Sequence, residues 1–111
     1  MLRSIKSPQR APRQLHFKVD GTGGSASILI GSKDATVAKV ATGRFTVTFE
    51  QAFAREPVAI PVVVYGAAGL IASISASSAS SVSVRIYDAA GVDQDADFHL
   101  MVQGFDAADE Y

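Results

Sequence analysis

The sequence predicts an all-β fold, with about eight antiparallel strands in a sandwich or barrel. Three observations support this prediction. Apolar residues alternate with polar ones at a period of two in several stretches. Clusters of Gly, Ser, Asp and Pro interrupt these stretches at a spacing of roughly 8–12 residues, which is typical of sandwiches and barrels. No stretch carries an apolar stripe at the helical period of 3.6 residues.

Four strands are predicted in the N-terminal half. Residues 15–19 alternate between large apolar and polar side chains, and residues 44–49 show the clearest alternation of the chain. Shorter candidates lie at 26–30 and 36–41. Glycine-containing turns separate these strands at 21–24, 31–34 and 42–43.

Four further strands are predicted at 58–65, 70–76, 81–86 and 98–103. Pro61 interrupts a valine-rich run, and because proline has no N–H to donate, this strand is expected at a sheet edge or with a bulge. The intervening turns lie at 56–57, 66–69, 77–80 and 88–95, and a single helical turn is possible at 51–55.

Size and composition favour one folded domain. The chain has 111 residues, of which 48% are hydrophobic and 19% are charged, a balance too apolar for a disordered chain. It contains no cysteine, which excludes disulfides and thiolate metal sites. Residues 1–20 show no apolar core of a signal peptide, and no apolar run approaches the roughly 20 residues of a membrane span.

Charge is distributed unevenly, although the formal net charge is only -1. Half of the cationic residues precede the first acidic residue, Asp20. After Arg85, every charged residue is acidic. We therefore predict an extended basic arm at 1–14, a β-sandwich domain at 15–105 and an acidic tail at 106–111. Pro8 and Pro12 favour an extended arm. A frayed terminus is the alternative interpretation of the arm. The early cationic residues are Arg3, Lys6, Arg10, Arg13 and Lys18.

The predicted strand at 58–65 is apolar on both faces. One sandwich covers only one face of a strand, so a second copy of the chain is expected to cover the other. The alternative is that a loop or the arm covers it. The expected oligomer interface consists of Val58, Ile60, Val63 and Tyr65.

Catalytic chemistry is not expected. The chain has no cysteine and no G-x-S-x-G motif, and its two histidines, His16 and His99, fall on the predicted outward side of their strands. The glycine-rich segment 21–24 lacks the lysine of a P-loop and the last glycine of a dinucleotide-binding motif. No cofactor is therefore expected.

Asp93, Asp95 and Asp97 alternate like the first ligands of a calcium loop. An EF-hand would then require glycine and glutamate where this chain has Phe98 and Gly104, so that motif fails. Two interpretations stay open, a calcium or magnesium site of another kind and a solvated acidic loop.

Two segments resemble a known family. One reads VAKVATGRFTVTF at 37–49 and continues to Phe53 and Glu-Pro-Val at 56–58, and the other reads SVSVRIYD at 81–88 and continues through Gly91 and Asp-Phe-His at 97–99. They are similar to β-sandwich modules of tailed-bacteriophage virions, over roughly residues 35–105. Such modules serve as capsid decoration (cement) proteins and as head-fibre or tail-fibre tips, are often trimeric and jelly-roll-like, and carry no catalytic residues.

The resemblance, with the short arm, implies a non-enzymatic decoration protein that is made in the host cytoplasm and then binds the outside of the major capsid protein shell as a homotrimer. Arg3, Lys6, Arg10 and Arg13 are expected to pair with shell carboxylates, without a role for nucleic acid or membrane. The alternative is a receptor- or glycan-binding tip that uses loops 66–69 and 88–97, although the chain has no Trp to stack on sugars.

Overall fold

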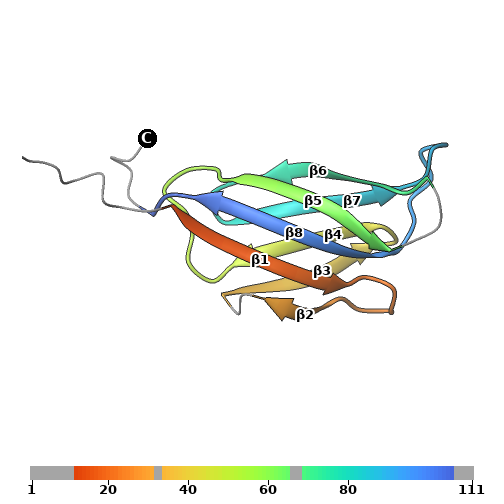
Figure 1. Ribbon diagram of the computed structural model, residues 1–111, viewed down its shortest axis with the longest axis horizontal. Helices are drawn as coiled ribbons and strands as arrows, with labels where there is room; N and C mark the ends of the chain where they lie inside the picture. The colour runs from red at the N-terminus through yellow and green to blue at the C-terminus, as the bar shows by residue number, and fades with distance from the viewer. Residues whose placement is uncertain (1–11, 32–33, 66–68, 107–111) are drawn as a thin grey trace, which may run out of the picture.

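A computed structural model describes residues 12–31, 34–65 and 69–106, which form eight strands and no helix. The strands build two antiparallel sheets of four that pack face to face as a β-sandwich (Figure 1). This confirms the all-β prediction, including all eight strands, whereas 51–55 forms bends and no helical turn. The strands are β1 (Arg13–Asp20), β2 (Ser27–Gly31), β3 (Ala35–Ala41), β4 (Arg44–Phe49), β5 (Val58–Tyr65), β6 (Ile71–Ser77), β7 (Ser81–Tyr87) and β8 (Asp97–Gly104).

The strand order within the sheets is β2-β1-β8-β5 in sheet A and β3-β4-β7-β6 in sheet B. Consecutive strands pair as hairpins in β1–β2, β3–β4 and β6–β7. A jelly roll wraps two Greek keys, in each of which three hairpin-connected strands lie side by side and a fourth returns beside the first. No sheet here contains three such strands, so the strand order does not confirm the jelly-roll-like connectivity.

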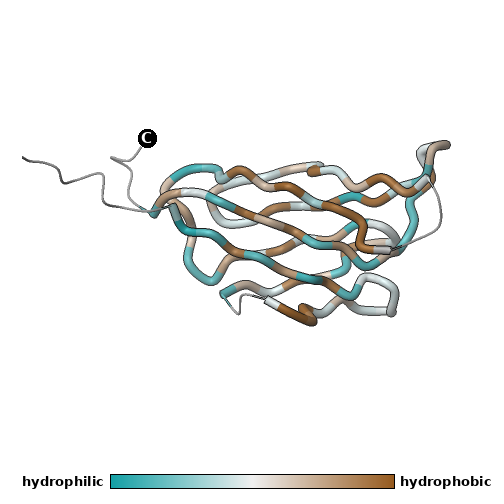
Figure 2. Tube along the Cα trace, viewed as in Figure 1, coloured by the Kyte–Doolittle hydropathy of each residue, from teal (hydrophilic) through white to brown (hydrophobic). Residues whose placement is uncertain are grey.

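The core forms between the two sheets from the inward positions of their central strands. Because side chains of a strand alternate between faces, every second residue of β1, β4, β7 and β8 is buried. Hydrophobic and hydrophilic residues alternate along the strands in the same way (Figure 2). The Phe45 and Phe98 rings meet across the sandwich at a centroid distance of 5.2 Å. Phe49 and Phe53 pack edge to face at 5.1 Å near one end of the sandwich. Such aromatic pairs stabilise the core beyond the area they bury.

Pro61 lies on an edge strand, where its lack of an N–H group is tolerated. β5 is an edge strand of sheet A, which confirms the first of the two alternatives expected for this proline. The register of β5 also shifts further along, between Val63 and Tyr65.

The first and last described residues emerge side by side at one end of the sandwich. Arg13 at the start of β1 pairs with Gly104 at the end of β8, in the middle of sheet A (Figure 1). The strand thus begins two residues before the predicted boundary of the basic arm. Residues 1–11 of that arm and residues 107–111 of the predicted acidic tail lie outside the described residues.

Candidate interaction surface

Apolar side chains gather on the outer face of sheet A. The outward residues of edge strand β5 are Val58, Ile60 and Val62, which are 67%, 53% and 54% exposed. Met101 on β8 pairs with Ile60 and is 47% exposed. Ile30 on β2 pairs with Lys18 and is 65% exposed. Three of the four strands therefore present aliphatic or thioether groups to water on the same face, which is unusual for a protein surface without a partner.

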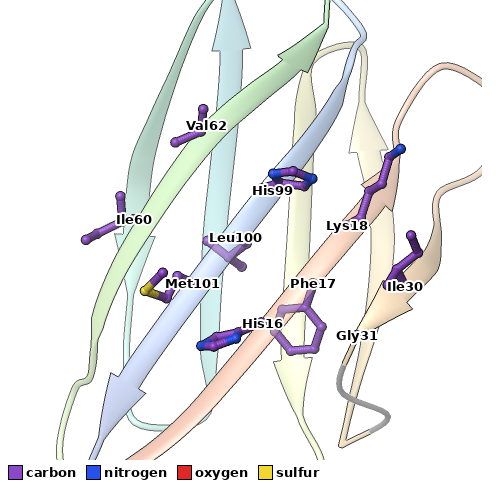
Figure 3. Close-up of a pocket in the computed structure, with 10 residues that line it drawn as sticks. All are labelled: His16, Phe17, Lys18, Ile30, Gly31, Ile60, Val62, His99, Leu100 and Met101. Atoms are coloured by element: carbon purple, nitrogen blue, oxygen red, sulfur yellow. The ribbon is translucent and has the colours of Figure 1, made fainter.

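A shallow groove of about 430 Å³ runs along this face over β1 and β8 (Figure 3). Lys18 and Ile30 line one side of the groove, while Ile60 and Val62 line the other. The two histidines project between these sides, and each is exposed, which confirms their predicted outward orientation.

The ionisable groups of the groove are confined to its central strands. Across sheet A, His16 lies opposite Met101, and His99 lies opposite both Lys18 and Val62. β5 contributes only apolar side chains to the groove. The face thus has an apolar side on β5 beside a strip of histidines and lysine.

The outer face of sheet B differs in character. Its central strands β4 and β7 place arginine, threonine and serine outward, as in the Thr46–Ser83 hydroxyl pair at 3.4 Å. Val40 on edge strand β3 and Ile71 on edge strand β6 are also exposed, but these two strands are the opposite edges of the sheet, separated by the polar outer faces of β4 and β7. The sandwich therefore has one apolar and one polar outer face.

The predicted interface residues divide between the two sides of β5. Val58 and Ile60 lie on the apolar face, as expected. Val63 does not share that face, because it packs against the core opposite Phe98. The side chain of Tyr65 lies outside the described residues. Val62 and Met101 belong to the surface and were not predicted, although both occupy the outward positions of their alternating strands.

Arg13 interacts with its own domain. Its Nη2 donates to the Gln51 carbonyl at 2.6 Å, its Nη1 lies 3.2 Å from Asp106, and its guanidinium covers the Phe53 ring at 4.0 Å. Since these contacts occupy the planar group, Arg13 belongs to the sandwich and not to a free arm. Arg3, Lys6 and Arg10 lie outside the described residues.

The alternating aspartates of the β7–β8 loop hold the opposite end of the sandwich together. The Asp93 carboxylate accepts one hydrogen bond from Arg44 Nε at 3.0 Å and another from Arg85 Nε at 2.7 Å. Asp97 accepts from the Gly21 N–H at 3.1 Å.

Asp95 makes the corresponding contacts to β3 and the β3–β4 turn. It accepts from Lys39 Nζ at 2.6 Å and from the Gly43 N–H at 2.7 Å. Lys39 also donates to the Gly23 carbonyl at 2.9 Å, so three loops meet here. Gly43 has a φ of +69°, which a residue with a Cβ adopts only under strain.

The loop carboxylates are shifted towards their ionised form. Hydrogen bonds from Arg85 and then Arg44 hold the pKa of Asp93 below its usual value. Burial raises the pKa of Asp95, but the Lys39 and Gly43 hydrogen bonds outweigh it, so that pKa is also lowered.

These contacts bear on whether Asp93, Asp95 and Asp97 form a calcium or magnesium site. The carboxylates of this acidic run already accept hydrogen bonds from the chain's own cationic side chains and backbone N–H groups. Within 12–31, 34–65 and 69–106, no group of three or more acids or histidines is arranged to hold a metal ion. The run therefore acts as a structural loop.

No polar or charged residue is fully buried in the described part of the chain. None of its elements is a helix long and apolar enough to cross a membrane. Comparison with protein-family models, with curated proteins and with solved structures found no match.

Proposed function

We propose that this chain is a non-enzymatic structural protein of a phage virion, a capsid decoration protein that binds the outside of the major capsid shell and stabilises it. The observation that carries the proposal is the exposed apolar outer face of sheet A, on a domain in which no described polar or charged residue is fully buried. Active sites require polar groups held away from water, whereas a binding module requires a contact surface.

The basic segment supports attachment to a shell. Arg3, Lys6 and Arg10 precede β1, and the chain enters β1 at one end of the sandwich. An eleven-residue segment spans at most about 36–40 Å when extended, enough to reach a neighbouring subunit. Cations on such a segment would pair with carboxylates of the shell. Several weak attachments in one oligomer add up to durable binding by raising the effective concentration of each arm.

Binding to capsids prepared without this protein tests the proposal. We expect the intact chain to bind and a chain lacking residues 1–11 to fold normally but lose most binding. Folding of the truncated chain is expected because Arg13 and its contacts are kept.

A triple variant Arg3→Ala, Lys6→Ala, Arg10→Ala should reproduce the loss. The matched variant Arg3→Lys, Arg10→Lys, which keeps the charge, should bind nearly as well as the intact chain. Undiminished capsid binding by the truncated chain would contradict the role of the arm, and absence of the protein from purified particles would contradict the virion assignment.

One observation favours a receptor- or glycan-binding tip as the second candidate. The β7–β8 loop lies at the end of the sandwich opposite Arg13 and Gly104 (Figure 1), as a tip anchored through its ends would require. Copy number distinguishes the two functions, because decoration requires hundreds of copies per particle and a fibre tip only a few. Binding of the isolated chain to host cells or a glycan array would favour the tip.

A further inference from the structure

We propose that the groove on the outer face of sheet A binds an extended segment of a partner protein in which acidic and aliphatic residues alternate. The segment lies along β8, with its carboxylates toward Lys18 on β1 and its aliphatic side chains toward β5. The inference deepens the proposed function and rests on it for one point only, that the segment belongs to the capsid shell.

The first argument is the order of side chains across the groove. One cross-strand row of sheet A consists of Ile30, Lys18, His99 and Val62. The next row along the strands consists of His16, Met101 and Ile60. In both rows the basic side chains lie on β1 and β8, and the β5 side is aliphatic (Figure 3). A partner that lies over β8 therefore meets cations on one side and apolar groups on the other.

The second argument is that this groove offers a cation without an acid. Among the described residues that line it there is no Asp or Glu. The ion pairs of the described part of the chain join aspartates to Arg13, Lys39, Arg44 and Arg85, and Lys18 is not among them. Lys18 is also half-buried, and partial shielding from water strengthens its attraction to an incoming acid. The groove thus complements an anionic partner.

The third argument is the spacing along the strands. An extended segment carries its side chains in two opposite rows, each with a repeat of two residues or about 6.8 Å. His16 and Lys18 on β1 are two residues apart, and so are Ile60 and Val62 on β5. A segment over β8 therefore matches both sides at once when acids alternate with aliphatic residues.

The shape of the surface favours a peptide over a lipid bilayer. Ile60 and Val62 line one side of the groove and Ile30 lines the other (Figure 3). A single extended chain fits between such sides, whereas a flat bilayer surface would rest on them and leave Lys18 and His99 beneath it. Covering Ile60 and Val62 removes apolar area from water and supplies affinity, while the charges supply selectivity.

Two blocked peptides test this chemistry, one with alternating Glu and Val and the other with alternating Lys and Val. Each is about seven residues long, or roughly 24 Å when extended. In NMR titrations of the isotope-labelled chain, the Glu peptide should shift the amide signals of Lys18, His99 and Ile60 and bind about 10-fold tighter than the Lys peptide or better. Added salt should weaken this binding, because it screens the selecting charges. Equal binding of the two peptides, or shifts confined to sheet B, would overturn the inference.

Val62→Glu places an acid beside His99 and removes an apolar contact, so it should weaken binding of the Glu peptide about 5-fold or more. Val40→Glu is the matched control, because it makes the same change at an exposed valine of an edge strand, but in sheet B. It should leave the dissociation constant within about twofold of wild type. Circular dichroism and thermal melting verify that both variants fold. Equal weakening by both would contradict binding in the groove.

Lys18→Glu tests the charge directly. It replaces the central cation of the groove by an acid, so the preference should reverse and the Lys peptide should bind tighter than the Glu peptide. A Lys18→Glu chain that keeps the wild-type preference would overturn the role of this lysine.

Two other occupants give different results. A wild-type dimer that dissociates in Val62→Glu but not in Val40→Glu would place a second copy on this face and overturn the inference. Binding of phosphatidylglycerol vesicles in preference to the Glu peptide would overturn it in favour of a lipid surface.

Capsid binding separates the inference from the proposed function. Shell binding that is weakened in Val62→Glu but not in Val40→Glu supports both. Undiminished shell binding by Val62→Glu, with no selective binding of the Glu peptide, overturns the inference and leaves the decoration role standing. Selective peptide binding by a chain that is absent from purified particles overturns the decoration role and leaves the assignment of the groove standing.

Discussion

Replacing Asp95 by alanine tests whether the end of the sandwich that carries the β7–β8 loop is held by one carboxylate. The side chain is 24% exposed and that of Lys39 is 14% exposed, so their contact is partly shielded from water. Asp95→Ala removes two hydrogen bonds to a charged acceptor and leaves the Gly43 N–H without its partner. The expected loss of unfolding free energy is about 2–3 kcal/mol after allowance for partial exposure.

Asp95→Asn separates the two contributions. It keeps an acceptor for the Gly43 N–H but loses the charge opposite Lys39, so the expected loss is only about 1 kcal/mol. Urea denaturation monitored by circular dichroism measures both values, and the alanine variant should melt about 10 °C or more below wild type. Asp34→Ala, at an exposed loop position, is the control and should be neutral. A loss below about 0.5 kcal/mol for Asp95→Ala would refute the argument that this carboxylate holds the loops together.

Three further outcomes follow from the same end of the sandwich. Gly43→Ala should destabilise the fold by more than about 2 kcal/mol, because its Cβ would lie 2.5 Å from the Ile86 carbonyl at a positive φ, whereas Gly24→Ala, with nothing within 4 Å, should be neutral in the same denaturation assay. Acid should weaken the fold: the folded pKa values of Asp93 and Asp95 lie below the unfolded value of about 3.9, so their stabilisation is complete above that pH and is lost as the pH falls through the folded values. Denaturation at neutral and acidic pH checks this, and a fold equally stable at both would contradict it. Calcium or a chelator should leave the melting temperature unchanged, since these carboxylates already have partners; a rise with calcium would show a metal site.

The strands were predictable from sequence because most of them show a local alternation of apolar and polar residues. Phe45, Val47 and Phe49 alternate with polar residues, and that local pattern alone determines a half-buried strand. The order of strands in the sheets is a different problem, because pairing joins residues as distant as Arg13 and Gly104. Alternation does not encode which strand becomes the neighbour. The strands themselves were therefore predictable, whereas the order in which they pair was not.

The candidate surface was predictable only in part, for a related reason. β5 is apolar on both faces, so no polar residue marks which side meets the core. Val63 turns inward because β8 places Phe98 beside it, a contact that only the fold supplies. Arg13 was assigned to the arm because it belongs to the run of cations that precedes the first acid, yet pairing with β8 and stacking on Phe53 bring it into the sandwich. The partners of the aspartates likewise come from β3, β4 and β7.

The adjacency of Arg13 and Gly104 has a mechanical consequence. Tension applied between the segment before β1 and the segment after β8 would load the hydrogen bonds of this ladder one after another, as in opening a zipper, and not all at once as in shear. The first bonds to carry the load would be those beside the Arg13–Asp106 ion pair. A tether that pulls on both ends should thus peel sheet A apart at low force, whereas a pull on the segment before β1 alone, against a body held at its opposite end, would shear β1 along both of its neighbours and meet far greater resistance.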